Sequence, residues 1–175
     1  MTTAQAWIGL GANLGDARAT LEAALQALNA LPETRLLRRS SFYRSAPVDA
    51  DGPDFINAVA CCETAMPPLA LLHEMQRIEL AYGRQRPYYH APRTLDLDLL
   101  LYGDQTMQTA ELMLPHPAIG KRAFVLLPLA ELDMALWIPG QGYVKDLLPQ
   151  VQDQRIERLS AVAGTSTDGI SGVSG

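Results

Sequence analysis

Two aspartates separated by one residue, Asp96 and Asp98, interrupt an apolar stretch that has a period of two. Side chains alternate across a strand, so both carboxylates project from one face while Leu95, Leu97 and Leu99 project from the other. Two such carboxylates, roughly 6 Å apart, repel by about 3 kcal/mol at an effective dielectric near 20. A divalent cation reverses the sign of that cost, and all-oxygen ligation favours magnesium over zinc. The pair predicts a magnesium site; the alternative is an edge strand with an acidic exposed face.

Basic residues gather beside this strand although the whole chain carries a net charge of −5. Three arginines lie directly upstream, Arg84, Arg86 and Arg93, and Lys121 with Arg122 follows a proline-rich turn. Carboxylates next to a cluster of arginines are typical of a site for a polyphosphate and its metal ions. We therefore expect phosphate chemistry here, since loops of this kind can close over a bound triphosphate.

Familiar nucleotide motifs are missing from the sequence. It contains no G-x-x-x-x-G-K-[ST] loop and no protein-kinase signature set. The glycine turn at Gly9–Gly15 has one residue too many for the dinucleotide fingerprint, and it also fits a tight strand-to-helix connection. His116 between two prolines is either a turn residue or a hydrogen-bond donor to phosphate.

Length and composition indicate an ordinary globular protein. The 175 residues are enough for one domain, expected over residues 1–160, followed by a Gly-, Ser- and Thr-rich tail over 161–175 that we predict to be disordered. The acidic balance argues against a nucleic-acid partner, and the most apolar region is too interrupted to span a membrane. The adjacent cysteines, Cys61 and Cys62, predict buried thiols in a reducing cytoplasm.

Hydrophobic periodicity predicts alternating strands and helices. A strand at 6–10 precedes a helix capped by Asp16 and carrying Leu21, Leu25 and Leu28, and Pro67-Pro68 opens a second helix that ends near Gly83. Further strands are expected at 36–44, 55–64, 94–102 and 123–127, with a hairpin over 137–144 before a last short helix. This order predicts an α+β sandwich with a mostly antiparallel sheet.

Five stretches of the sequence together resemble one enzyme family. They are G-L-G-A-N-L-G at 9–15, S-F-Y-R at 41–44, P-D-F-I-N at 53–57, Q-R-I-E at 76–79 and A-P-R-T-L-D-L-D-L at 91–99. In order and spacing, over residues 5–158, the chain resembles 6-hydroxymethyl-7,8-dihydropterin pyrophosphokinase of the folate pathway. The resemblance implies a ferredoxin-like monomer that uses ATP and two Mg²⁺ ions to transfer pyrophosphate to the pterin hydroxymethyl group, releasing AMP.

The same resemblance implies a role for each matching residue. Asp96 and Asp98 would bridge the metal ions, and Arg84 and Arg93 would stabilise the transferring group. The nucleotide contacts would come from Gln76, Glu79, Arg84, Arg86, Arg93, Leu99, His116 and Arg122. The pterin would lie between Phe55 and Phe124, with its hydrogen-bonding edge read by Asn57 and its pocket lined by Ser45, Pro47 and Val48. Loops around Val48 and Tyr88 would close over the site.

The chain departs from the family pattern at three places. Tyr89-His90-Ala91 stands where Arg-Trp-Gly is frequent, Glu111 where an arginine is frequent, and Phe55 where a tyrosine is frequent. These departures concern loop closure and one nucleotide contact rather than the reaction. Two alternatives stay open: another metal-dependent ATP phosphotransferase, and a non-enzymatic ferredoxin-like module that binds RNA or a partner protein.

Overall fold

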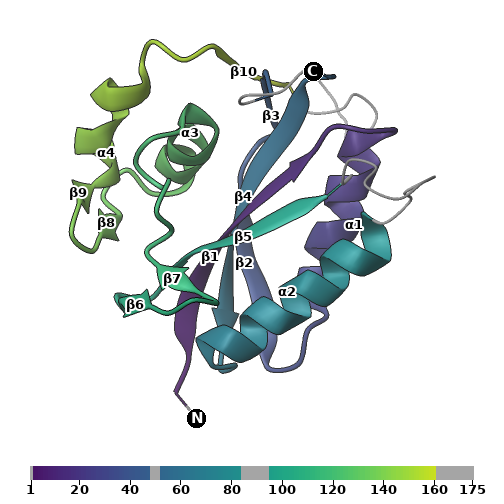
Figure 1. Cartoon of the computed structure of the whole chain (residues 1–175), viewed down its shortest axis with the longest axis vertical. Coiled ribbons are helices and arrows are strands. Elements are labelled where there is room, and N and C mark those ends of the chain that lie inside the picture. The colour runs from purple at the N-terminus through teal and green to yellow at the C-terminus, as the bar shows by residue number, and fades with distance from the viewer. Residues whose placement is uncertain (1, 48–51, 84–94, 161–175) are drawn as a thin grey trace, which may run out of the picture.

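An antiparallel sheet forms the centre of the computed structural model, which describes residues 2–47, 52–83 and 95–160 (Figure 1). Within these ranges its strands lie in the order β10–β3–β4–β1–β5, and β2 pairs with β4 beside β3. The strands are β1 (Ala4–Ala12), β2 (Thr34–Arg39), β3 (Tyr43–Ser45), β4 (Phe55–Thr64), β5 (Asp96–Tyr102) and β10 (Ile156–Arg158). All the pairings are antiparallel, as the sequence predicted.

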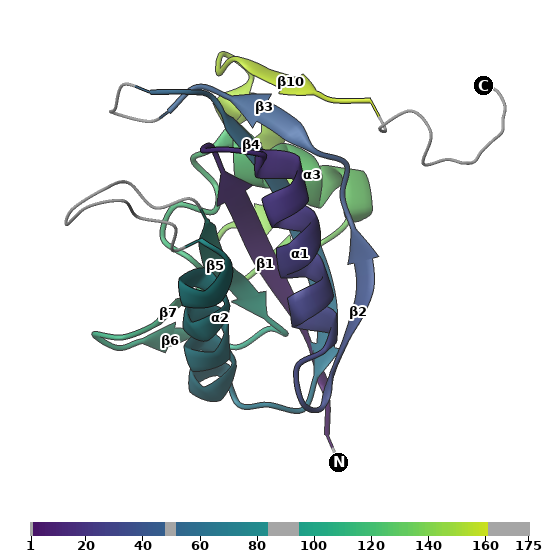
Figure 2. The same ribbon diagram turned by 90° about the vertical axis from the view of Figure 1, so that its right-hand side faces the viewer.

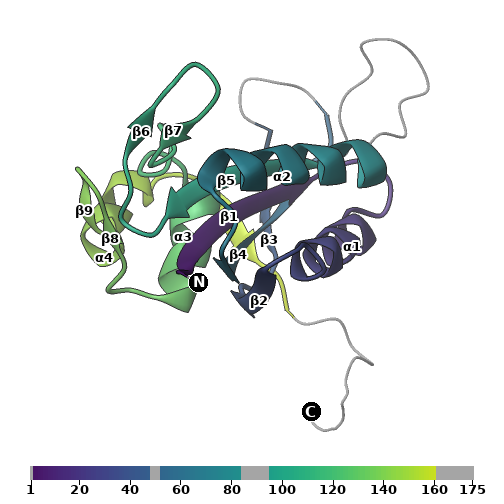
Figure 3. The ribbon, with the colours of Figure 1, turned by 90° about the horizontal axis from the view of Figure 1, so that it is seen from below.

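Helices cover both faces of this sheet. On one face α1 (Ala17–Asn29) and α2 (Pro68–Tyr82) lie side by side (Figure 2). On the other face lies α3 (Ala123–Leu132), followed by the short α4 (Val144–Leu147) and the 3₁₀ turn η1 (Leu148–Val151), so that three layers are visible from below (Figure 3). Two small hairpins complete the described part, β6 (Met107–Gln108) with β7 (Met113–Leu114) and β8 (Trp137–Ile138) with β9 (Gly142–Tyr143). None of the helices in the described ranges is long and apolar enough to cross a membrane.

The order β1-α1-β2/β3-β4-α2-β5 is that of a ferredoxin-like α+β fold, which confirms the predicted fold class. Asp16 caps α1, because its carboxylate accepts a hydrogen bond from Ala19 N–H at 3.1 Å. Pro68 opens α2 at its first position, where a missing N–H costs nothing. These local signals placed both helices correctly. The predicted tail at 161–175 lies outside the described residues.

Two predicted strands are wrong in part or in whole. The strand expected at 36–44 is interrupted at residues 40–42, because Ser40 Oγ accepts the Val59 N–H at 2.9 Å and takes the place of a regular ladder bond. The strand expected at 123–127 is instead the start of α3. A short apolar run is compatible with either element, and here Val125, Leu126 and Leu129 share the helix face that packs on the sheet.

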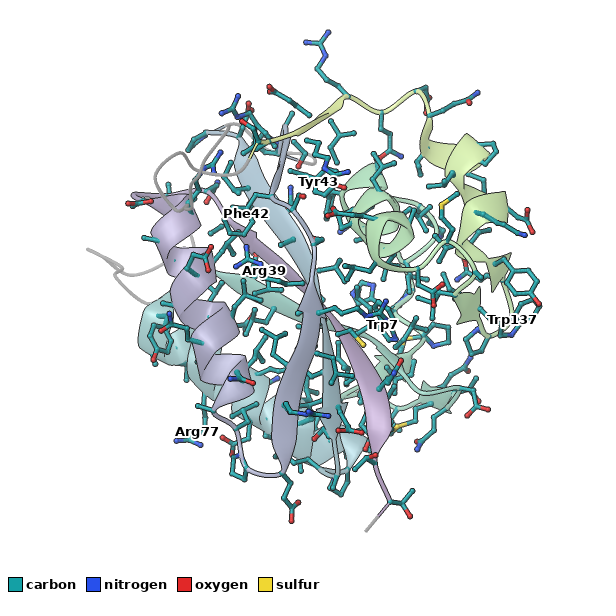
Figure 4. All side chains as sticks on the ribbon, turned by 180° about the vertical axis from the view of Figure 1, so that it is seen from behind. Trp7, Arg39, Phe42, Tyr43, Arg77 and Trp137 are labelled. Carbon is teal, nitrogen blue, oxygen red and sulfur yellow. The ribbon has the colours of Figure 1, made fainter. Side chains whose placement is uncertain are left out.

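Each face of the sheet has its own hydrophobic core. Ile8 and Leu10 of β1 belong to the core under α1 and α2, whereas Trp7 belongs to the core under α3. Figure 4 shows the same division in β3 and its approach, since Phe42 lies toward α1 and Tyr43 toward α3. The adjacent cysteines are divided in the same way. Both are free and buried, Cys62 in the first core, under α1 and α2, and Cys61 in the second core, under α3. Burial raises the pKa of Cys62 to about 12, so its thiol stays protonated.

Candidate active site

The two aspartates of β5 lie on the face of the sheet that carries α3. Leu97 and Leu99, the alternate residues, are buried in the core under α1 and α2, so the predicted division of side chains is confirmed. Across the sheet, Asp96 pairs with Gly11 and Asp98 with Gly9. After Leu99, β5 has a bulge at Leu100, because Ile8 pairs with Leu99 but the neighbouring Trp7 pairs with Leu101. As a result, Leu100 and Leu101 both lie in the second core.

A cavity of about 440 Å³ opens in front of this pair, within the usual size range of small-ligand sites. Most of its wall comes from the sheet and from the first turn of α3. The lining residues include Gly9, Gly11, Ser45, Ala46, Phe55, Asn57, Glu79, Asp96, Asp98, Arg122, Phe124 and Val125. Acidic, amide and aromatic groups therefore share one cavity.

Glycines on β1 make room for this cavity. Gly9 and Gly11 alternate with large apolar residues along the strand, so their missing side chains leave the sheet open on the α3 face. A Cβ at Gly11 would approach Asn57 Oδ1 to 3.2 Å and the Phe55 ring to 3.7 Å. These two glycines are not among the predicted site residues, although their two-residue spacing within a strand is a signal of close approach that the sequence contains.

The predicted pterin-binding residues are mostly brought together. Ser45, Phe55, Asn57 and Phe124 all line the cavity. Asn57 is 4% exposed and donates from Nδ2 to Ser45 Oγ at 2.8 Å, which fixes the orientation of its amide. Pro47 is half-buried and does not line the cavity, and Val48 lies outside the described residues.

Of the predicted nucleotide contacts, Glu79, Arg122 and His116 lie at or beside the acidic pair. Glu79 lines the cavity, and one of its carboxylate oxygens accepts the Leu97 N–H at 2.7 Å, which ties α2 to the start of β5. Arg122 stacks on Phe124, with Cζ 5.6 Å from the ring centroid. These contacts arrange a cation and an aromatic ring at the same edge of the cavity.

His116 faces Asp98 across a gap of 3.9 Å between Nε2 and Oδ1. Its Nδ1 accepts the Ala118 N–H at 3.1 Å. This bond leaves the ring proton of a neutral imidazole on Nε2, the atom that faces the carboxylate. The proline-flanked turn thus aims a hydrogen-bond donor toward the acidic pair.

Other predicted nucleotide contacts are placed elsewhere or not described. The Leu99 side chain is buried in the opposite core, and Gln76 is exposed on α2 outside the cavity lining. Arg84, Arg86 and Arg93 lie outside the described residues, as do Tyr88 and the Tyr89-His90-Ala91 departure. Glu111, which stands where the family frequently has an arginine, pairs with His73 of α2.

A polar cluster at the C-terminal end of α3 holds this helix against the sheet. Glu131 accepts hydrogen bonds from the Ser41 backbone and hydroxyl at 2.9 to 3.0 Å and from Tyr43 OH at 2.7 Å, and Arg158 lies 3.2 Å away. Burial works to raise the pKa of Glu131, but these hydrogen bonds and the arginine outweigh it and lower that pKa below its ordinary value. For Tyr43, burial and the bond to Glu131 raise the pKa of the phenol. The cluster therefore stabilises an ionised glutamate.

The donor set at the cavity suits a hard cation. In the part of the chain that the structure describes, no three acidic, histidine or cysteine side chains converge as a closed metal site. Asp96 and Asp98 supply two carboxylates beside an open cavity, which matches the way magnesium is held in nucleotide sites, by one or two carboxylates together with phosphate and water oxygens.

Fold and site together define a class: a ferredoxin-like α+β domain whose acidic strand borders an aromatic and amide-lined ligand cavity. Residues 7–134 match the family model described as 7,8-dihydro-6-hydroxymethylpterin-pyrophosphokinase. The chain belongs to this family and is an enzyme of the pyrophosphokinase class.

Individual relatives agree with the family match. The chain is 45% identical over 154 residues to a Pseudomonas aeruginosa 2-amino-4-hydroxy-6-hydroxymethyldihydropteridine pyrophosphokinase, with 87% of this chain and 95% of the relative covered. It is 43% identical to the Haemophilus influenzae protein of the same name, covering 89% and 98% of the two chains. Among solved structures, wild-type Plasmodium falciparum HPPK-DHPS with pteroate has a TM-score of 0.68 at 14% identity, which supports the fold. The match covers 85% of this chain and 42% of that longer one.

Proposed function

We propose that the protein transfers a pyrophosphoryl group from ATP to the hydroxymethyl group of 6-hydroxymethyl-7,8-dihydropterin, as a step of folate biosynthesis. The observation that carries this proposal is the single cavity shared by Asp96 and Asp98 with Asn57, Phe55 and Phe124. A flat heterocycle needs aromatic faces and an amide edge, and a polyphosphate donor needs carboxylates that can hold its metal ions. Aromatic, amide and carboxylate side chains all line this cavity. The names of the relatives support the pterin acceptor and the transfer of pyrophosphate.

In the proposed reaction the pterin hydroxyl oxygen forms a bond to the β-phosphorus of ATP. The bond from that phosphorus to the oxygen bridging the α- and β-phosphates breaks, AMP leaves with the bridging oxygen, and the hydroxyl proton is released. Transfer of this kind depends mainly on positioning and on neutralising charge. The chain's residues therefore serve chiefly to hold two substrates in line.

The residues would divide this work between them. Asp96 and Asp98 would hold two Mg²⁺ ions, which when bound supply neutralisation of the phosphate charge. Asn57, held by Ser45, would read the pterin edge, and Phe55 and Phe124 would cover its faces. Glu79, His116 and Arg122 would contact the nucleotide. The family resemblance adds Gln76, Leu99, Arg84, Arg86 and Arg93 to the nucleotide side, and Pro47 and Val48 to the pterin side.

We propose further that the protein acts as a monomer in the cytoplasm. Both cysteines are free thiols in the described structure, which suits a reducing compartment. Size-exclusion chromatography with light scattering tests the monomer directly, since a dimer would double the mass expected for a 19.0 kDa chain.

The test is an assay of AMP formation with ATP, magnesium and 6-hydroxymethyl-7,8-dihydropterin, with chromatographic detection of the nucleotides. The site variant is Asp96→Asn/Asp98→Asn, and the matched control is Asp104→Asn, an exposed aspartate in the turn after β5. We expect pterin-dependent AMP from the wild type and from the control, and none from the site variant. ADP or phosphate released without pterin would instead indicate a different ATP phosphotransferase. Absence of any nucleotide turnover would favour the binding-module alternative.

A further inference from the structure

The first turn of α3 brings side chains to the candidate active site, yet its own residues do not cap it. Arg122 is the N-cap residue, with extended backbone (φ −129°, ψ 125°), and its side chain makes no capping hydrogen bond. The first N–H groups of a helix have no partner within the helix, so they need one from elsewhere. Because Arg122, Phe124 and Val125 all line the cavity, whatever holds this turn also sets the shape of the cavity.

Gln154, distant in sequence, holds this turn. Its Oε1 accepts the Ala123 N–H at 2.9 Å, and its Nε2 donates to the Lys121 carbonyl oxygen at 2.8 Å. One side-chain amide thus bonds to the backbone on both sides of Arg122, and both its donor and acceptor sides are used. A glutamine is suited to this task because it carries both groups in one plane.

The backbone of Gln154 connects η1 to the sheet. Its own N–H bonds to the Val151 carbonyl oxygen at 3.0 Å. Two residues later Ile156 begins β10 and pairs with Ser45, the residue that fixes Asn57. The segment that carries Gln154 therefore connects the α3 side of the cavity to the β3 side.

We propose that Gln154 is a positioning residue for the transfer reaction: its amide holds the Lys121–Ala123 backbone so that Arg122 and Phe124 face the substrates. Gln154 does not line the candidate active site. It borders an adjoining cavity of about 580 Å³, which shares Ser45, Arg122 and Phe124 with the active site. Its effect on the substrates is therefore indirect, and the inference rests on the proposed function for its catalytic readout.

The test variant is Gln154→Met, which keeps the length of the side chain and removes both hydrogen bonds. Gln152→Met is the matched control, because Gln152 is an exposed glutamine of the same segment that lines neither cavity. We expect Gln154→Met to raise KM for both substrates by roughly tenfold while kcat changes by less than about threefold. The reason is that a less fixed Arg122 and Phe124 weaken binding of the substrates and of the transition state alike. The control should leave both parameters unchanged. An unchanged KM in folded Gln154→Met, or an equal fall of activity in both variants, would overturn the proposal.

Two further measurements separate positioning from mere stability. Combining Gln154→Met with Phe124→Leu should cost less than the product of the two single effects, because both changes act on the same contact; independent, multiplicative effects would refute it. Hydrogen exchange at the Ala123 amide should be faster in Gln154→Met while the amides of the sheet keep their protection. An unchanged exchange rate at Ala123 would refute the proposal that Gln154 holds this backbone. Hydrogen exchange does not depend on turnover. An inactive wild-type protein would therefore count against the proposed function, while the exchange rate at Ala123 would still test whether Gln154 holds the backbone. Should Gln154→Met fail to fold, Gln154→Glu, which keeps the acceptor to Ala123 and loses the donor to Lys121, takes its place in the kinetic measurements. In that variant KM should rise while the Ala123 amide keeps its protection, and an unchanged KM would overturn the proposal.

Discussion

The two faces of the central sheet are built from the same strands and serve opposite purposes. Toward α1 and α2, β1 presents Ala6, Ile8, Leu10 and Ala12, all buried in a continuous core. Toward α3 the same strand presents Trp7 and then the two glycines, Gly9 and Gly11. All four residues on the first face belong to a core, whereas on the second face only Trp7 does.

The difference shows how one alternation can produce both a core and a cavity. Helix α3 packs against the filled half of the second face, together with Leu100 and Leu101. Beyond it the glycines leave space, which Asn57, Asp96 and Asp98 border with polar groups. Stability and function are thus separated by the direction of a side chain rather than by distance along the chain. Four changes can break or sharpen this separation.

The largest effect is expected from Asp98→Asn on the open face. Loss of one carboxylate from the proposed metal site should lower kcat/KM by about 10³-fold. The unfolding temperature should stay the same or rise, since the repulsion from Asp96 is relieved. Steady-state assays and thermal unfolding of the same preparation measure both quantities. Substantial activity in this variant would assign the carboxylate a role other than metal binding.

Leu99→Ala, one residue further on the filled face, should do the reverse. Leu99 is 2% exposed in the core, and removing it should lower the free energy of unfolding by about 3 kcal/mol. Activity per folded molecule should change little. Urea unfolding gives the stability, and the KM for ATP tests the predicted nucleotide contact: an unchanged KM would show that the Leu99 side chain does not contribute to ATP binding, and a large rise in a folded sample would show that it does.

Glu131→Gln tests the link between α3 and the sheet. Losing a charged acceptor for the Ser41 and Tyr43 bonds should cost about 2 kcal/mol at neutral pH. Because the pKa of Glu131 is lower in the folded than in the unfolded protein, its stabilisation is complete above the ordinary value of 4.5 and is lost as pH falls through the folded pKa. Unfolding free energies from pH 7 down to acid should therefore converge for the two proteins. Glu157→Gln, which removes an exposed pair with Arg44, is the control and should show no such convergence.

The smallest effect is expected from Gly11→Ala. The added Cβ would lie 3.2 Å from Asn57 Oδ1, so the amide must shift, and we expect the KM for pterin to rise about fivefold. Gly9→Ala is the comparison, because its Cβ would meet Leu100 at 3.5 Å, an ordinary contact. Pterin binding should be less affected there. Equal effects from the two changes would mean that the width of the cavity matters more than the position of Asn57.

Much of this arrangement could be predicted because its signals are local. The alternation of Asp96 and Asp98 with leucines indicated both the strand and its two faces, and Asp16 and Pro68 placed the helix starts. The prediction of a strand at 123–127 was wrong because a five-residue apolar run carries too little periodicity to tell helix from strand. In the structure the run is helical, and its buried residues share one core with Trp7 and Leu101.

The sequence by itself determined which groups were available: two carboxylates on one strand face, an amide and aromatic rings, and the alternation that separates them from the core. The tertiary structure decided which of these groups meet. Asn57 and Asp96 both lie beside Gly11 because β4 and β5 flank β1 in register. Arg122 lines the same cavity from the start of α3, a helix that Gln154 and Glu131 hydrogen-bond to the rest of the fold. Contacts between residues so far apart in sequence depend on strand pairing and helix packing, whose energies are spread over the whole fold and leave no local pattern to read.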